Sequence, residues 1–107
     1  MATQLPHPTE QIVEVEEVHR AQPPQYRVVM FNDDFTTKEF VVYILVEIFH
    51  KALAEATELM WRIHHQGKGI AGVFPRDIAE TKVAAVSELS REQGFPLKVT
   101  IEPEDTA

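Results

Sequence analysis

The stretch YRVVMFNDDFTTKEFVV, residues 26–42, shows where a strand gives way to a helix. Residues 26–31 are mostly β-branched or aromatic, which predicts a short strand. The polar residues Asn32–Asp34 follow, and because their side chains bond to nearby backbone, the strand should end there in a turn. Thr36 and Glu39 have the spacing of a capping box, with Thr36 as the N-cap, which predicts a helix beginning at residue 37.

The next stretch has the periodicity of two consecutive helices. Apolar residues recur at spacings of three and four, which predicts a first helix over 37–50. Its apolar positions are Phe40, Val41, Ile44, Leu45, Ile48 and Phe49. A break near Lys51 separates it from a second helix over about 54–66, and Gly67 can adopt the left-handed conformation that commonly ends a helix.

The remaining residues predict a strand, a third helix and a final strand. Residues 69–74 are too short and too rich in glycine for a helix, so we expect a strand. Pro75 suits the first turn of a helix, which should continue to Gln93 and stop at Gly94. Residues 97–102 alternate as a half-buried strand does. The third helix should partly bury Ile78, Val83, Val86 and Leu89.

The order β-α-α-β-α-β predicts an α+β fold, in which a small antiparallel sheet of three strands carries three helices on one face. A length of 107 residues leaves room for one compact domain, which we place at residues 26–107. Residues 1–25 contain four of the seven prolines and an acidic centre, which predicts a flexible N-terminal extension. Within it, residues 12–18 partly alternate between apolar and acidic, so a strand or a docking segment is a second interpretation.

The composition excludes several classes of function. A net charge of −7 repels the phosphate backbone, so we expect no nucleic-acid partner. The chain has no cysteine, which excludes disulfides, thiolate zinc sites and cysteine nucleophiles. It contains no apolar run long enough to span a membrane and no signal-peptide pattern. We therefore expect a cytoplasmic protein without a membrane partner.

Two groups of residues could carry chemistry. The first is the polar run Asn32–Asp34 at the junction of strand and helix. The second is Met60, Ile63 and His64, which share one face of the second helix. Taken alone, the first group could be only a loop that caps a helix, and the second could be only part of the core.

The sequence gives little support to a catalytic interpretation. His64 and His65 could bind a divalent metal with the acids at 33 and 34, and His64 with Asp34 could act as a base and its orienting partner. Adjacent helical side chains point about 100° apart, however, which separates the two histidines. The chain has no paired-histidine zinc motif, nucleophile elbow or phosphate loop. We expect no enzymatic activity, no metal and no cofactor.

The same residues are better suited to binding a cation. A carboxylate, an asparagine carbonyl and a neutral imidazole are all hydrogen-bond acceptors, and a set of acceptors favours a cation with several donors. An α-ammonium group has three donors and is mostly charged at neutral pH. Met60 and Ile63 could line an apolar cavity beside it.

Three motifs in register closely resemble the ClpS family, the bacterial and plastid adaptors that recognise N-terminal degradation signals. They are YRVVMFNDDFTTKEFVV at 26–42, EATELMWRIHHQGKGIAGVF at 55–74, and DIAETKVAAVSEL at 77–89 followed by PLKVTIE at 96–102. The resemblance implies a fold like the C-terminal domain of the ribosomal stalk protein. It also implies a non-enzymatic adaptor that binds the free α-amino group and a bulky first residue (Leu, Phe, Tyr or Trp) of its substrates.

The resemblance implies a role for each matching residue. The acceptors for the substrate's α-ammonium group would be Asn32, Asp34 and His64. The pocket mouth, near the first two substrate residues, would be formed by Asp33, Thr36 and Lys38. The cavity for the first side chain would be lined by Val41, Met60, Ile63 and Leu97.

The resemblance also implies partners. Asp77, Glu80 and Lys82 match positions that dock on the N-terminal domain of a ClpA-type unfoldase, or a ClpC-type unfoldase in plastids, although a solvated helix face would look the same. The extension at 1–25 would be pulled toward the unfoldase pore during delivery. We expect a bacterial, cytoplasmic monomer whose partners are N-degron proteins and peptides and an AAA+ unfoldase.

Lys38 departs from the family pattern, in which this position is usually a methionine that gates the pocket. A flexible cation there could widen the entrance, attract acidic residues at the second substrate position or repel basic ones. We therefore expect substrates with an acidic second residue to bind better. Trp61 and Arg62 flank the pocket residues and should turn largely away from the pocket.

Two other functions stay open at this point. A ribosomal-stalk-like interaction domain would explain the order of elements, but not an Asn-Asp-Asp run opposite His64. A small metal-dependent hydrolase is the third hypothesis. A peptide that begins with Leu or Phe separates the three, because only an adaptor binds it and rejects its N-acetylated twin, and only a hydrolase turns it over. Binding to an adaptor should weaken on acidification, when His64 becomes a donor.

Overall fold

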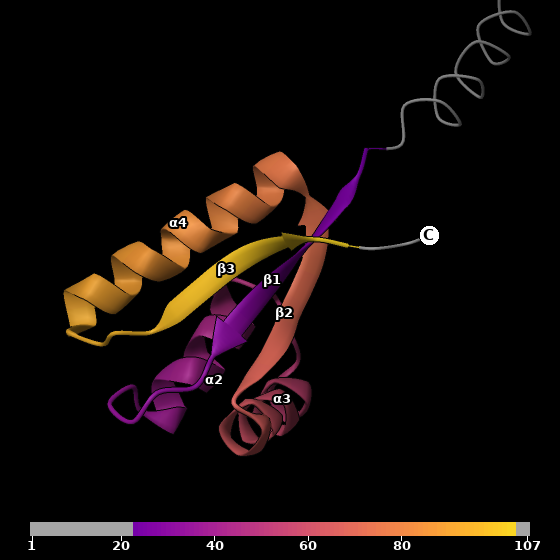
Figure 1. The fold of residues 1–107 in the computed structure, drawn as a ribbon. Coiled ribbons are helices and arrows are strands. Elements are labelled where there is room, and N and C mark those ends of the chain that lie inside the picture. The colour runs from indigo at the N-terminus through magenta and orange to yellow at the C-terminus, as the bar shows by residue number, and fades with distance from the viewer. Residues whose placement is uncertain (1–22, 105–107) are drawn as a thin grey trace, which may run out of the picture.

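The computed structural model describes residues 23–104, and it confirms the expected order of elements (Figure 1). The elements are β1 (Gln25–Phe31), α2 (Lys38–Glu47), α3 (Leu53–Gln66), β2 (Lys68–Pro75), α4 (Arg76–Gln93) and β3 (Lys98–Pro103). Most of the extension expected over residues 1–25, with the docking segment considered inside it, lies outside the described residues. None of the helices described is long and apolar enough to cross a membrane.

The sheet has the strand order β2-β1-β3, and both strand pairs are antiparallel, so β1 is the central strand. Figure 1 shows the helices gathered on one face of the sheet. α4 packs against all three strands, α3 packs against β2, and α2 packs against α3. This arrangement is the α+β architecture that the sequence predicts.

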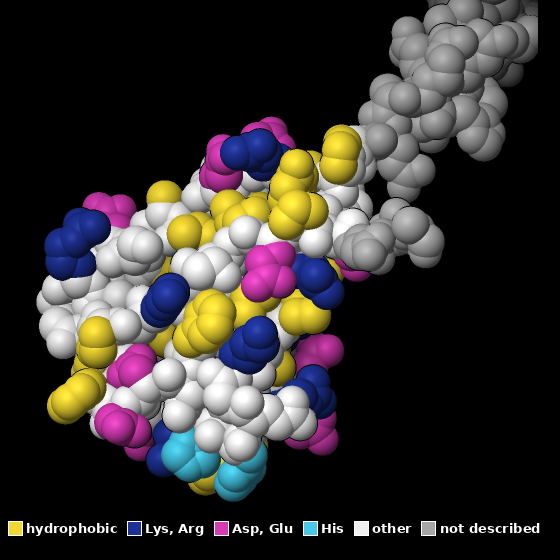
Figure 2. Space-filling view, viewed as in Figure 1, with side chains coloured by type: hydrophobic (Ala, Val, Ile, Leu, Met, Phe, Trp, Pro, Cys, Tyr) yellow, Lys and Arg dark blue, Asp and Glu magenta, His cyan; other side chains and the backbone are white. Residues whose placement is uncertain are grey.

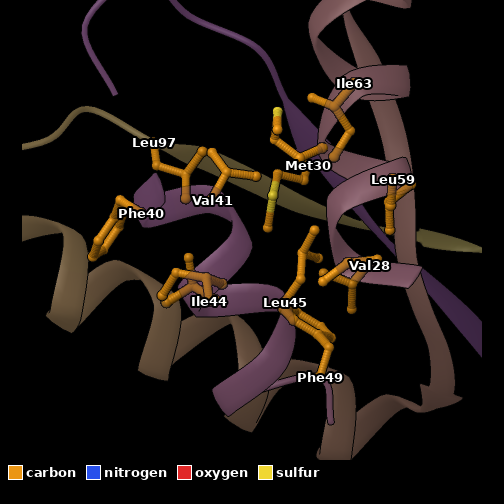
Figure 3. Close-up of a cluster of buried hydrophobic side chains, with 14 of the residues drawn as sticks. Val28, Met30, Phe40, Val41, Ile44, Leu45, Phe49, Leu59, Ile63 and Leu97 are labelled. Carbon is orange, nitrogen blue, oxygen red and sulfur yellow. The ribbon is translucent and has the colours of Figure 1, made fainter. Parts of the chain in front are cut away.

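The core lies between the sheet and the helices (Figure 3). Val28 and Met30 alternate along β1 and point toward the helices, while Ile44 and Leu45 of α2 meet them, and all four side chains are fully buried. Burying each such side chain stabilises the fold by about 1.5–3 kcal/mol. The apolar stripe expected on the first helix is therefore the surface that holds α2 in place.

The start of α2 differs from the prediction by one residue. The N-cap is Thr37, whose Oγ1 accepts a 3.1 Å hydrogen bond from the N–H of Phe40. Thr36 does not cap the helix because its hydroxyl donates to Oδ2 of Asp33 at 2.7 Å. The helix ends at Glu47 rather than at residue 50, and the chain leaves it through a left-handed residue at position 50.

The start of α4 also differs. Pro75 is the last residue of β2 and the N-cap of α4, not part of the first helical turn. An edge strand such as β2 tolerates proline. Ile78 is 44% exposed, so its expected burial is wrong, whereas Val86 is buried and both Val83 and Leu89 are half-buried. The buried face of α4 passes through Ala79, and Ile78 lies about 100° away from it around the helix.

Candidate functional site

The loop after β1 is organised by Asp33. Its Oδ1 accepts hydrogen bonds from the N–H groups of Phe35 at 2.8 Å and Thr36 at 2.7 Å, and its Oδ2 accepts one from the Thr36 hydroxyl. Burial alone would raise the pKa of the Asp33 carboxyl, but the hydrogen bonds from Thr36 and Phe35 outweigh it and hold the pKa below its ordinary value. The carboxylate therefore fixes the shape of the loop that carries Asn32 and Asp34.

A backbone hydrogen bond ties this loop to the end of α3. The N–H of Asn32 donates to the carbonyl of Gly67 at 2.9 Å. Gly67 has a φ of 92°, and its own N–H donates to the carbonyl of Ile63 at 2.8 Å, so the chain turns sharply out of the helix. As a result, the polar loop lies beside the last turn of α3, which carries His64.

A pocket of about 140 Å³ opens at this junction, between the loop, α2, α3 and the residue before β3. It brings together every residue predicted for the substrate site: Asn32, Asp33, Asp34, Thr36, Lys38, Val41, Met60, Ile63, His64 and Leu97. Phe31 also lines the pocket and was not predicted. Its position, directly before the acidic loop, was the only signal in the sequence that could have identified it.

The inner wall of the pocket is the outer edge of the hydrophobic core. Val41, Met60, Ile63 and Leu97 all belong to the core cluster and are at most 8% exposed. Figure 3 shows Val41 and Leu97 side by side at one end of that cluster. Their positions are held by packing, so the apolar wall is preformed. An engineered cavity of about 150 Å³ holds one benzene molecule, so a single large apolar side chain fits here.

The rim contains a cluster of aromatic and cationic side chains. The Nζ of Lys38 lies 5.7 Å from the centroid of the Trp61 ring, a distance typical of a cation–π contact. The same ring stacks on His65 and meets His64 edge-on, with centroids 5.9 Å apart in both cases. Trp61 does not line the pocket, as expected, but it contacts two residues of the rim and so supports them. Arg62 lies toward the sheet, at a different hollow.

The two adjacent histidines are closer than their helical phase suggests. The ring centroids of His64 and His65 are 5.2 Å apart because both rings pack on Trp61. Within residues 23–104, however, no three histidine, cysteine, aspartate or glutamate side chains come close enough together to hold a metal ion. The arrangement offers hydrogen-bond acceptors next to an apolar cavity, which is the chemistry of a binding site for an amphiphilic cation.

The residues predicted for docking all lie on α4 and differ in their exposure. Asp77 and Glu80 are exposed on α4, where Glu80 pairs with Arg76 at 3.0 Å. Lys82 is half-buried, and its Nζ donates a 2.7 Å hydrogen bond to the carbonyl of Ile48 after α2. Lys82 is five positions after Asp77, which places the two well apart around the helix. Lys82 therefore anchors α4 to the end of α2.

Comparisons with known proteins agree with the motifs. The model of the family described as ATP-dependent Clp protease adaptor protein ClpS matches residues 21–100. The ATP-dependent Clp protease adapter protein ClpS of Desulforapulum autotrophicum is 60% identical over 82 residues, which cover 77% of this chain and 79% of the relative. The protein of the same name from Myxococcus xanthus is 41% identical over 106 residues, which cover 98% of this chain and 99% of the relative.

A solved structure shares the fold as well as the sequence. The structure of Agrobacterium tumefaciens ClpS2 bound to L-phenylalaninamide matches with a TM-score of 0.74 at 40% identity. The match covers 78% of this chain and 100% of that one. The sequence motifs, the family match and the shared fold lead to one conclusion: this chain belongs to the ClpS family of adaptors of the ATP-dependent Clp protease.

Proposed function

We propose that this adaptor binds the free α-amino group and the bulky hydrophobic first residue (Leu, Phe, Tyr or Trp) of N-degron substrates and delivers them to the AAA+ unfoldase of a ClpAP-type protease. The observation that carries the proposal is a single pocket of about 140 Å³ that has hydrogen-bond acceptors at its mouth and core side chains as its wall. Only the first residue of a chain carries an ammonium group and a side chain on the same Cα atom.

The polar part of the pocket suits an α-ammonium group. Asn32, Asp34 and His64 provide an amide oxygen, a carboxylate and an imidazole, which are enough acceptors for its three donors. Hydrogen bonds that involve a charged group are worth about 1.5–3 kcal/mol each. An acetylated chain start has one N–H and no charge, so it loses most of this binding energy.

The apolar part of the pocket suits one bulky side chain. Burying a Leu or Phe side chain stabilises a complex by about 1.5–3 kcal/mol. After the entropic cost of association, these contributions give an affinity near micromolar, or about −8 kcal/mol. The ligand named for Agrobacterium tumefaciens ClpS2, L-phenylalaninamide, combines a free α-amino group with a benzyl side chain. It therefore has both features that the pocket of this chain would recognise.

The rim sets access to the pocket in this proposal. The hydrogen bonds from Thr36 to Asp33 fix the loop at the mouth, while Lys38 contacts the ring of Trp61 at the edge. Because a lysine side chain is long and flexible, Lys38 can leave Trp61 for an anionic group on the substrate. Lys38 would therefore act at the second substrate position, not in the cavity.

Delivery of the substrate to the unfoldase would involve residues outside the pocket. We propose that Asp77 and Glu80, exposed on α4, contact the N-terminal domain of the unfoldase, and that Lys82 supports that surface by holding α4 against the end of α2. Residues 26–107 would form the adaptor core, and residues 1–25 would form an extension that the unfoldase engages. The protein would act as a monomer in the bacterial cytoplasm and would not itself cleave its substrates.

A fluorescent peptide that begins with Leu, titrated beside its N-acetylated twin, tests the proposed function. An adaptor of this kind binds the free peptide near micromolar affinity and rejects the acetylated one. Equal binding of both peptides, or of neither, would show that the pocket does not recognise a chain start. Turnover of the peptide would instead reveal an enzyme.

A further inference from the structure

The face of the sheet opposite the helices has an apolar centre. Because side chains alternate along a strand, Arg27, Val29 and Phe31 of β1 point away from the helices, and Val29 is only 4% exposed there. Beside them, Ile70 and Val73 of β2 are 45% and 38% exposed. Figure 2 looks onto this face and shows hydrophobic, Lys and Arg side chains at its centre, with an acidic side chain among them and other acidic side chains toward the edges.

The cations of this face surround Phe31. Lys68 of β2 and Lys98 of β3 both pair with Phe31 in the strand register, and their Nζ atoms lie 5.9 and 5.2 Å from its ring centroid. Arg27 and Arg62 line an adjacent hollow of about 430 Å³. Glu102 lies among these cations and pairs with Arg27 at 3.7 Å. Around Phe31, Lys68 and Lys98 make the face locally positive on a protein whose net charge is −7.

We infer that this open face is the docking surface for residues 12–18 of the same chain. The segment reads Ile-Val-Glu-Val-Glu-Glu-Val, and it combines three acids, Glu14, Glu16 and Glu17, with aliphatic side chains. In an extended chain Ile12, Glu14, Glu16 and Val18 point to the same side. That side would present two carboxylates to Lys68 and Lys98 and two aliphatic side chains to the apolar centre of the face. The inference does not depend on the function proposed for the pocket.

The length of the connecting chain fits this docking. A strand rises about 3.3 Å per residue, so Phe31 lies about 20 Å along β1 from its first residue. An extended chain spans about 3.3–3.6 Å per residue, so the six steps from Pro23 back to Glu17 cover about 20 Å, and the nine steps to Glu14 about 30 Å. The docking requires the chain to reverse its direction before Gln25, and these lengths then bring the acids over the cations that flank Phe31.

The covalent connection between residues 12–18 and β1 favours this segment over a separate molecule as the occupant of the face. A segment tethered by a short flexible linker has an effective concentration in the millimolar range. Contacts too weak to hold a free peptide are then sufficient to keep the segment on the face. Because the contacts are largely between charges near the surface, salt should weaken them.

Paramagnetic broadening in the full-length chain tests the docking. The chain has no cysteine, so Gln11→Cys provides a single position for a nitroxide label next to the segment. At low salt, the amide signals of Lys68 and Lys98 should lose most of their intensity, while that of Glu88 on α4 should keep it. Raising the salt to about 1 M, where the Debye length is ~3 Å, should restore much of the lost intensity.

Two charge-matched variants make the test specific. Lys68→Gln combined with Lys98→Gln should abolish the broadening. Lys51→Gln combined with Arg91→Gln removes the same charge away from the face and should leave the broadening unchanged. Uniform broadening of the sheet and α4, or broadening that survives the first pair, would overturn the docking.

A mixture of chains identifies which molecule supplies the segment. Spin-labelled chains without ¹⁵N are mixed with unlabelled ¹⁵N chains, and the ¹⁵N signals are recorded. Intramolecular docking predicts no broadening of Lys68 and Lys98 in the mixture. Broadening there would assign the face to a second copy of the chain and overturn the inference.

Discussion

The N–H of Asn32 and the carbonyl of Gly67 form a 2.9 Å hydrogen bond that joins the end of β1 to the end of α3. The two residues are far apart in the sequence, and the bond brings the loop of Asn32 and Asp34 next to the helical turn of His64. The geometry of the pocket mouth therefore depends on the left-handed turn at Gly67.

Gly67→Ala should weaken both the fold and the binding of peptide. A Cβ at Gly67 meets no atom within 4 Å, so the cost comes from the positive φ of 92° alone. We expect a loss of about 1–2 kcal/mol in the free energy of unfolding and a lower affinity for a peptide that begins with Leu. Urea unfolding and a fluorescence titration measure the two effects.

Gly94→Ala is the matched control. Gly94 also has a positive φ, 77°, with no atom within 4 Å of the added Cβ, but it ends α4 and does not line the pocket. The control should lose a similar amount of stability and keep the parental affinity. If both variants bind the peptide as tightly as the parent, Gly67 does not position the mouth.

Asp33→Asn should make the free energy of unfolding less dependent on pH in the acidic range. Hydrogen bonds hold the pKa of folded Asp33 below its ordinary value of 3.8. The carboxylate therefore stabilises the fold above the ordinary pKa, and this contribution disappears as the pH falls through the folded pKa. The variant should be about 1 kcal/mol less stable at pH 7, because the amide nitrogen of Asn cannot accept the hydrogen bond from the Thr36 hydroxyl. The difference in urea midpoint between parent and variant should shrink toward pH 2, and a constant difference would contradict this role.

His64→Ala should weaken the binding of a Leu peptide, because it removes the imidazole acceptor from the pocket mouth. We expect the affinity to fall about tenfold, or ~1.4 kcal/mol, which is in the range of one lost hydrogen bond to a charged group. His65→Ala is the matched control, because His65 does not line the pocket, and it should keep the parental affinity. A fluorescence titration measures both variants, and equal affinities of His64→Ala and the parent would exclude His64 as an acceptor.

Lys38 should favour an acidic second residue. Exposed ion pairs are worth about 0.2–1 kcal/mol, so a Leu-Glu peptide should bind up to about fivefold more tightly than a Leu-Lys peptide. Lys38→Met should abolish the preference, and Lys51→Met should preserve it. Trp61 is the single tryptophan and lies 5.7 Å from the Nζ of Lys38, so its emission should change when Lys38 moves to the peptide. Equal affinities of the parent for the two peptides would refute this role.

The order of elements was predictable because the pattern of apolar residues in each segment agrees with the face that the segment buries in the structure. The alternation along β1 and the apolar stripe of α2 both reappear as the two sides of the core. The cap of α2 was not predictable, since Thr36 and Thr37 are equally suited to it. The hydrogen bonds of Asp33 take up Thr36 and leave the cap to Thr37.

The pocket was only partly predictable from residues alone. Helical spacing places Met60, Ile63 and His64 on one face, but it does not say what lies opposite. The hydrogen bond between Asn32 and Gly67 places the loop of Asn32 and Asp34 opposite this face. The family motifs, not the spacing of residues, predicted that the loop and His64 belong to one site. The hydrogen bond from Lys82 to the carbonyl of Ile48 could not be predicted from the sequence, because it depends on where α2 ends.

The most direct measurement is a thermodynamic cycle in which acetylation of the peptide is combined with loss of the acceptors. Calorimetry gives the affinities of a Leu peptide and its N-acetylated twin for the parent and for the variant with both Asp34→Ala and His64→Ala. If the acceptors recognise the free chain end, acetylation should weaken binding to the parent by about 100-fold, or ~2.7 kcal/mol, and should have little effect on the variant. A variant that binds the free amine as tightly as the parent, or that suffers the same loss on acetylation, would contradict the account.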